Sequence, residues 1–471
     1  MSPDSARTWR SLLVFLSGLI AAGAAVQPEI DVDTWWHLRV GEYVAETRSV
    51  PTTDPFSQVG QSEGRPWVAY SWLYEVGLYA TFRVGGLGGL PYARFLLSAA
   101  MLATLAWYLH RRAENPWAAA VAFAMAVPAV YPLLTERPWH VTIIGTLLTL
   151  HAIESVRAGE PIRRFWWLAL VYVVWANVHV QFVLGLGLFG LAAGVGVLER
   201  RPVGGLIGLA AACALATLVN PYHVRLYGVI YEYATYTGAL SVIAELRPPN
   251  PANWWVWPVM AMTAWAIVAV VRRRFRLWDV ALLAVGVVFA ARMQRDGWFG
   301  LVCAATVALH GDVPPARAAG RGAALVVLAA FAMVRGVWDF GLIAHATAAD
   351  EVRKKYPADA VRAVLSHRPP GRLFNHLSSG GYLIWELRDY PVWIDGRTNL
   401  HGDARLYQHQ AVWLAGPGWE DDPDLRAAGV IVAPRQILGV DTPLTKEMLD
   451  RPDRWRVLHA DEVAVVFVPA R

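Results

Sequence analysis

Residues 166–198, WWLALVYVVWANVHVQFVLGLGLFGLAAGVGVL, contain no aspartate, glutamate, lysine or arginine. Apolar stretches of this kind are typical of helices that cross a bilayer, each of which needs ~20 residues. Similar blocks recur along the chain, which is 56% hydrophobic and 17% charged. The composition therefore predicts an integral membrane protein.

The apolar blocks predict a polytopic α-helical membrane protein with about 11 transmembrane helices. They lie at residues 11–27, 92–110, 116–134, 140–156, 166–180, 182–198, 203–219, 254–271, 278–291, 296–310 and 322–341. Arginines cluster in every second gap between blocks, which predicts that those gaps face the cytoplasm. The N-terminus is then cytoplasmic, and an odd number of spans leaves the C-terminal segment outside.

Two segments near the N-terminus allow alternatives. Residues 72–90 are apolar but carry five glycines and two charged residues, which favours an interfacial or re-entrant segment over a twelfth span. The first helix begins after two arginines and ends in small residues, a pattern that also resembles a cleavable signal peptide.

The chain divides by composition into a membrane domain, residues 1–343, and a soluble extracytoplasmic domain, residues 344–471. The first outer loop, residues 28–91, belongs to the membrane domain. Short apolar runs separated by Pro, Gly and charged residues predict a small α/β fold for the second domain. These runs are Tyr382–Trp385, Val392–Ile394, Val430–Val432 and Val463–Val468, with helices expected near Ala358–Ser366 and Thr445–Arg451.

The net charge of +5 comes from basic residues that lie in the gaps between apolar blocks. Membrane topology explains that distribution better than a nucleic-acid partner does. Cys213 and Cys303 both lie inside apolar blocks, which indicates packing residues rather than a disulfide or a metal cluster.

The first outer loop contains DVDTWWHLRVGEYVAETRSVPTTDPFS, residues 31–57. Trp36, Val40 and Val44 share one face at helical spacing, so the segment after Asp33 is expected to be a helix lying on the membrane. One interpretation makes Asp33 an N-cap and Asp31 a solvated acid. The other makes them a general base or the ligands of a divalent cation, Mg²⁺ or Mn²⁺.

An acidic first outer loop, a following amphipathic helix, many spans and a C-terminal outer domain resemble the GT-C membrane glycosyltransferases. The phrases DTWWHLRVGEY, PTTDPFS, GRPWVAYSWLYE, WANVHVQFVLG, NPYHVRLY, SSGGYLIWEL and VWIDGRTNLHGD also resemble a bacterial branch near that superfamily. This resemblance implies a sugar donor linked to polyprenyl phosphate. It also implies that Asp33 or Asp31 is the catalytic acid, and Asp33 is favoured as the base.

A phosphate leaving group is stabilised by cations at the departing oxygen and needs little help from a general acid. Residues predicted on the outer side that suit substrate binding are Arg137, His140, His179, Arg225, Arg292, Arg295 and the acid Glu75. Each has a structural alternative: Arg137 can pair with Glu136 and Arg295 with Asp296, while a lone histidine is usually a packing residue. Arg292 is the most embedded of these residues between apolar runs.

Asp54, before a proline, is most simply a turn residue. In the C-terminal domain, SSGGYLIW and VWIDGRTN predict strand-entry turns, with a local ion pair between Asp395 and Arg397. The functional alternative is that His376, Asp395 and Arg397 select the acceptor.

The leading hypothesis is an inverting glycosyltransferase of the bacterial cytoplasmic membrane, active in the cell envelope. It would move a sugar from the lipid carrier to a glycan, lipid or protein on the outer side. A non-catalytic protein that binds lipid-linked glycan or organises envelope assembly is the second hypothesis. A transporter is the third, although no repeated halves are visible.

Overall fold

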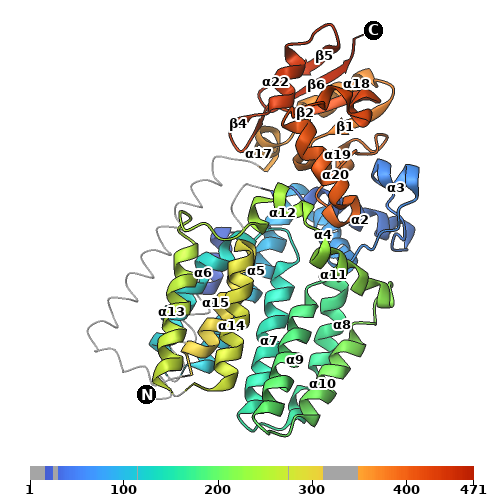
Figure 1. Ribbon diagram of the computed structural model, residues 1–471. Helices are drawn as coiled ribbons and strands as arrows, with labels where there is room; N and C mark the ends of the chain where they lie inside the picture. The colour runs from blue at the N-terminus through green and yellow to red at the C-terminus, as the bar shows by residue number, and fades with distance from the viewer. Residues whose placement is uncertain (1–15, 25–29, 114, 274, 311–347, 471) are drawn as a thin grey trace. The chain divides into compact units, whose positions relative to one another are not determined.

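The computed structural model describes residues 16–24, 30–113, 115–273, 275–310 and 348–470. The predicted span at 322–341 lies outside the described residues, as does much of the one at 11–27. The chain divides into two compact units (Figure 1). Unit 1 comprises residues 1–27, 90–224 and 243–345, and unit 2 comprises residues 28–89, 225–242 and 346–471.

Helices are the only regular secondary structure in the described residues of unit 1. Its helices are α5 (Gly89–Arg112), α6 (Pro116–Val130), α7 (Trp139–Arg157), α8 (Leu168–Val178), α9 (Phe182–Leu198), α10 (Gly204–Ala216), α13 (Val256–Arg272), α14 (Leu277–Arg292) and α15 (Gly297–Ala308). Short 3-10 turns include η2 (Tyr131–Leu133), η5 (Ala244–Leu246) and η6 (Gln294–Asp296). Helices α6, α13, α14 and α15 pack together, and α7 to α10 form a second group.

The prediction of about 11 transmembrane helices is wrong for the part of the chain that is described. Only two helices there, Trp72–Arg112 and Pro116–Leu133, are long and apolar enough to cross a membrane. The other apolar blocks break into shorter helices. Helix α8 ends at Val178 because His179 is extended, so the block at 166–180 contains a helix of only 11 residues. Even the 17 residues of α9 rise about 25 Å, which is less than the ~30 Å of a bilayer core.

Unit 2 is assembled from three separate stretches of sequence. The first contains α2 (Thr34–Thr47), α3 (Gln58–Glu63), α4 (Trp72–Gly85) and η1 (Gly86–Gly88), and the second contains α11 (Leu226–Thr235) and α12 (Gly238–Val242). The third contains α17 (Ala348–Lys355), α18 (Ala358–His367), β1 (Arg372–Asn375), α19 (Leu377–Glu386), α20 (Thr398–Trp413), η7 (Trp419–Asp421), α21 (Pro423–Arg426), β2 (Ala428–Pro434), β3 (Gln436–Ile437), β4 (Val440–Asp441), α22 (Pro443–Leu449), β5 (Trp455–Ala460) and β6 (Ala464–Pro469). The structure thus groups the first outer loop with the C-terminal segment, whereas the sequence-based division at 343 separated them.

The C-terminal segment contains a sheet with strand order β1-β2-β6-β5. Strands β1 and β2 are parallel, and the other neighbours are antiparallel. The expected strands at Val430–Val432 and Val463–Val468 are confirmed by β2 and β6, and both expected helices by α18 and α22. The expected strand at Tyr382–Trp385 is wrong: this run belongs to α19, which begins where the His376 side chain caps Ser378.

Helix α2 forms after Asp33 as expected, but its apolar face is not left for a membrane surface. Trp36, Val40 and Val44 are buried, and the helix packs against α4 and α19. Burial within unit 2 therefore explains the amphipathic pattern of α2 that the sequence assigned to an interface.

Candidate active site

The polar side chains of interest in unit 2 come from all three of its stretches. They lie at the start of α2, on the segment from Asp54 to α4, on helix α11, and on the segment from Ile394 to the start of α20. Figure 1 shows α2, α4, α11 and α20 at the same end of this unit. Residues far apart in the sequence thereby meet in one polar region.

Asp31 and Asp33 have different positions at the entrance of α2. The Asp31 Oδ1 atom accepts a hydrogen bond of 2.9 Å from the backbone N–H of Asp33, as in an Asx turn. Asp33 occupies the N-cap position, yet within the described structure its side chain makes no capping hydrogen bond. Asp31 therefore stabilises the turn. Asp33 stands at the N-cap position, but its carboxylate does not cap the helix.

The Asp33 carboxylate lies against Gly396 instead. A Cβ atom built on Gly396 would come within 2.1 Å of Asp33 Oδ1 and within 3.4 Å of the indole nitrogen of Trp36. Only glycine permits so close an approach of backbone to carboxylate. The indole N–H of Trp36 is buried and has no hydrogen-bond partner among the described residues. A carboxylate and an unused donor therefore lie beside the same backbone turn.

His37 and Glu75 form a buried pair between α2 and α4. His37 Nδ1 lies 3.0 Å from Glu75 Oε1, and the two residues are 3% and 1% exposed. Gly41 allows the helices to come this close, because a Cβ there would be 2.1 Å from the Glu75 carbonyl oxygen. The second oxygen, Oε2, is buried without a hydrogen-bond partner in the described part of the chain. Such a group is costly unless water or a ligand satisfies it.

Arg397 connects the first loop to the C-terminal segment through buried ion pairs. Its guanidinium donates hydrogen bonds of 2.8 and 2.7 Å to Asp395 and one of 2.6 Å to Asp54. The guanidinium carbon also lies 4.6 Å from the centre of the Trp67 ring. Burial opposes ionisation of Asp395, but Arg397 and His401 outweigh it and hold the pKa of that carboxyl well below its usual range. The expected Asp395–Arg397 pair is therefore confirmed.

Asp54 does more than shape a turn. Its carboxylate accepts backbone hydrogen bonds from Phe56 at 3.2 Å and Ser57 at 2.9 Å, as the turn prediction implied. The same carboxylate binds Arg397. Asp54, Arg397 and Asp395 thus form one clamp, which is called the Arg397 clamp below.

A second chain of hydrogen bonds joins the three stretches of unit 2. The Tyr70 and Tyr233 hydroxyls are 3.0 Å apart. Tyr233 donates to the Asn399 Oδ1 atom at 3.2 Å, and Asn399 Nδ2 donates to Glu232 Oε2 at 3.1 Å. These contacts fix α11 against the first turn of α20.

The electrostatics of Tyr70 link this chain of hydrogen bonds to the acids. Burial raises the pKa of Tyr70 well above its usual value, and Tyr233, Glu75 and Asp33 raise it further. Because Glu75 and Asp33 both act on one phenol, the two acids belong to a single polar region. That region contains a general-base candidate, buried hydrogen-bonding groups and aromatic rings, which suits a ligand with hydroxyl groups.

The predicted cations Arg137 and Arg295 meet in unit 1. Their Nη1 atoms lie 3.2 and 3.1 Å from the same oxygen of Glu245, a partner that neither expected local pairing predicts. Arg295 also lies over the Trp139 ring, with 4.9 Å between its guanidinium carbon and the ring centre. Glu136 pairs with Arg94 in the core of the unit.

His140 and His179 lie near these arginines, and both are buried. His140 contacts the Arg137 carbonyl at 3.2 Å and the Ser98 hydroxyl at 3.1 Å. His179 Nδ1 is 2.6 Å from the Thr142 hydroxyl. These partners fit the packing role that the sequence allowed for each histidine.

The two remaining predicted arginines are exposed. Arg225 precedes α11 in unit 2, and Arg292 is the last residue of α14 in unit 1. Although Arg292 lies between apolar runs in the sequence, the residue is exposed at the end of α14.

No group of three or more His, Cys, Asp and Glu side chains is placed to hold a metal ion within the described residues. Asp31 and Asp33 stand on a turn outside the helix. The backbone angles of Asp33, φ −83° and ψ −15°, are in the α-helical region.

Comparison with protein-family models finds no match to this chain, and comparison with curated proteins finds none either. The functional argument therefore rests on the residues themselves. Sequence reasoning missed Tyr70, Tyr233, Asn399 and the close approach at Gly396. The available signal was the density of polar and aromatic residues in GRPWVAYSWLYE and VWIDGRTNLHGD.

Proposed function

We propose that this chain is an inverting glycosyltransferase that uses a polyprenyl-phosphate sugar as donor and Asp33 as general base. The observation that supports it most is the Asp33 carboxylate, which lies beside Gly396 instead of capping α2. In the proposed step, this carboxylate accepts the proton of an acceptor hydroxyl while the acceptor oxygen bonds to the anomeric carbon. The bond from that carbon to the phosphate oxygen breaks, and its electron pair leaves with the phosphate.

Glu75 and Trp36 supply the acceptor contacts in this proposal. The Glu75 Oε2 atom is a buried hydrogen-bond acceptor, and the Trp36 indole N–H is a buried donor. His37 fixes the other Glu75 oxygen and thereby its orientation. An acid and an indole placed in this way are complementary to two sugar hydroxyls.

Arg137 and Arg295, which lie in unit 1, stay predicted phosphate-binding residues. Their shared contact with Glu245 orients two planar guanidiniums, which suit phosphate oxygens better than a point charge does. His140, His179, Arg225 and Arg292 stay predicted substrate-binding residues. The acceptor is a glycan, a lipid or a protein.

A bacterial cytoplasmic-membrane location belongs to the proposal, with the N-terminus inside and the C-terminal segment outside. Its support is the apolar surface of unit 1, which a protein surrounded by water would rarely expose. Exposed side chains on α8, α9, α10, α13 and α14 include Leu170, Val174, Val197, Leu198, Ile207, Leu215, Trp257, Ile267, Val271 and Val288.

A divalent cation, Mg²⁺ or Mn²⁺, bound by Asp31 and Asp33 is a narrower form of the proposal. Treatment with EDTA followed by addition of each ion tests it. Loss and recovery of transfer support a cation at these acids. Unchanged transfer assigns the role to the Asp33 carboxylate alone.

The proposal is tested with the purified full-length chain and a panel of undecaprenyl-phosphate hexoses and pentoses. Mass spectrometry of lipid that co-purifies with the protein selects the donor and guides the choice of acceptor. Release of undecaprenyl phosphate that depends on acceptor, with inversion at the anomeric carbon, is the expected result. Donor binding without release in the presence of that acceptor contradicts transfer and supports the non-catalytic glycan-binding alternative.

A further inference from the structure

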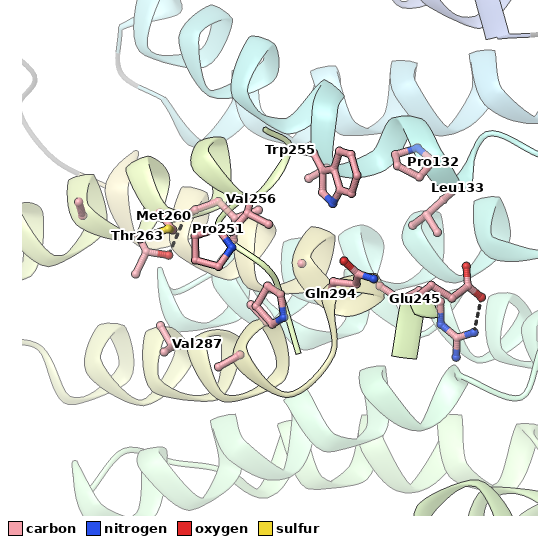
Figure 2. A pocket seen from close by; sticks show the side chains of 18 of the residues that line it. Pro132, Leu133, Glu245, Pro251, Trp255, Val256, Met260, Thr263, Val287 and Gln294 are labelled. Atoms are coloured by element: carbon pink, nitrogen blue, oxygen red, sulfur yellow. Dashed lines mark hydrogen bonds and ion pairs between the residues drawn. The ribbon is translucent and has the colours of Figure 1, made fainter. Parts of the chain in front are cut away.

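Unit 1 contains a cavity of about 530 Å³ between α13, α14, η2 and the segment before α13 (Figure 2). This volume is within the range of small-molecule sites. Most of its wall is apolar, including Val256, Met260 and Ile267 from α13 and Val287 from α14. The cavity is called the α13–α14 groove below.

The charged groups of the α13–α14 groove lie at one end, which is called the polar end below. In Figure 2, Glu245 lies at one side and Gln294 nearer the middle, whereas Met260, Thr263 and Val287 lie at the other side. Arg295, which pairs with Glu245, lines the same polar end. The groove is therefore amphipathic along its length.

The charge at the polar end is positive. Glu245 is shared by Arg137 and Arg295, so two guanidiniums face one carboxylate. Asp296 interacts with Arg295 and with Arg292. The group then contains three guanidiniums, those of Arg137, Arg292 and Arg295, and two carboxylates. The Nε atom of Arg295 is buried and has no hydrogen-bond partner in the described part of unit 1. An anion at this position would satisfy that donor.

We propose that the α13–α14 groove binds the hydrocarbon chain of a lipid whose phosphate headgroup lies on Arg295. The apolar wall excludes a sugar or a nucleotide as the main occupant, because their hydroxyl groups would be buried without partners. The unbalanced guanidinium favours a phosphate over a neutral headgroup. The inference rests on the phosphate-binding role proposed for Arg295, but it does not require that the bound lipid react.

The test uses the full-length chain in phosphatidylcholine nanodiscs and hexadecyl phosphate with a photoactivatable diazirine at the chain end. Labelled peptides are identified by mass spectrometry. The expected label falls on α13 and α14. Met260→Trp fills the groove and should reduce labelling by about tenfold, as should Arg295→Gln, which removes the charged contact. Val288→Trp is the matched control, because Val288 is exposed on α14 and does not line the groove.

Two further arms separate the headgroup from the chain. A hexadecanol probe with the same diazirine should label these helices less than the phosphate does, and inorganic phosphate should not compete. Equal labelling by the alcohol, or displacement by inorganic phosphate, overturns the proposal. So does undiminished labelling of Met260→Trp. Ile267→Trp provides a second groove-filling variant. Arg295→Gln adds no bulk to the groove, so it still tests the proposal if both tryptophan variants fail to fold.

Discussion

The Asp33 carboxylate lies so close to Gly396 that a Cβ atom built there would be 2.1 Å from Asp33 Oδ1. This close approach joins the acidic first loop to the IDGR turn of the C-terminal segment. Neither residue indicates this contact by its position in the sequence. The contact defines the candidate active site, because it accounts for a carboxylate at a helix start that does not cap the helix.

Gly396→Ala should displace Asp33 while leaving the remaining side chains unchanged. The added methyl would stand 2.1 Å from the carboxylate oxygen, and misplacement of a reacting group by about 1 Å can reduce turnover by ~100-fold. We expect kcat to fall far more than the KM for donor changes. Gly77→Ala is the control, since nothing lies within 4 Å of a Cβ at that position. Equal kcat values for the two variants would argue against the contact.

Arg397→Ala should destabilise the protein strongly. It leaves the buried carboxylates of Asp54 and Asp395 without their partner, and breaking a buried pair costs about 3–5 kcal/mol. Arg426→Ala removes a solvent-exposed pair with Asp421 and should cost less than about 1 kcal/mol. Thermal unfolding of the two variants checks this difference, and similar midpoints would show that the Arg397 clamp contributes little.

His376→Asn should make stability less sensitive to acid. Burial lowers the pKa of His376 to about 3, below the ~6.5 of an unfolded histidine. The free energy of unfolding therefore does not depend on the protonation of this histidine above pH ~6.5. As the pH falls from ~6.5 toward 3, the free energy of unfolding decreases by at most about 1.4 kcal/mol per pH unit, because only the unfolded chain protonates His376. Asparagine retains a side-chain cap for α19. The unfolding midpoint measured at pH 7 and pH 5 should drop more for the wild type, and parallel drops would contradict this account.

The proposed topology is open to a cysteine test, because Cys213 and Cys303 are buried and give little background. Asp453→Cys lies on the C-terminal segment, and Arg200→Cys lies in a gap predicted to be cytoplasmic; both positions are exposed. A membrane-impermeant maleimide applied to intact cells should label Asp453→Cys only. Both should react after lysis. Labelling of Arg200→Cys in intact cells would contradict the proposed orientation.

Local sequence signals were sufficient for part of the structure. A helix after Asp33, the turn at Asp54 and the Asp395–Arg397 pair each depend on residues only a few positions apart. The contacts of Asp54 with Arg397 and of Tyr70 with Tyr233 were not predictable, because only the folded chain brings these residues together. The sequence around each of these residues does not indicate which distant residue it contacts.

Counting apolar blocks overestimated the number of spans in the described part of the chain for a physical reason. Hydropathy measures how apolar a segment is, whereas a span also requires an unbroken helix of ~20 residues. The extended residue His179 ends α8 inside an apolar block. Similarly, the amphipathic face of α2 indicated burial correctly, but it did not specify that α4 and α19 would cover it.

The assignment of Asp33 as general base is tested most directly by comparing Asp33→Asn with Asp31→Asn in the acceptor-dependent transfer assay. Asparagine at 31 can still accept the hydrogen bond from the backbone N–H of residue 33, so this variant preserves the turn and removes only a charge. The account predicts that Asp33→Asn lowers kcat by about 10²- to 10⁴-fold without loss of donor binding, and that Asp31→Asn stays close to wild type. Wild-type turnover of Asp33→Asn, or equal inactivation of both variants, would contradict it.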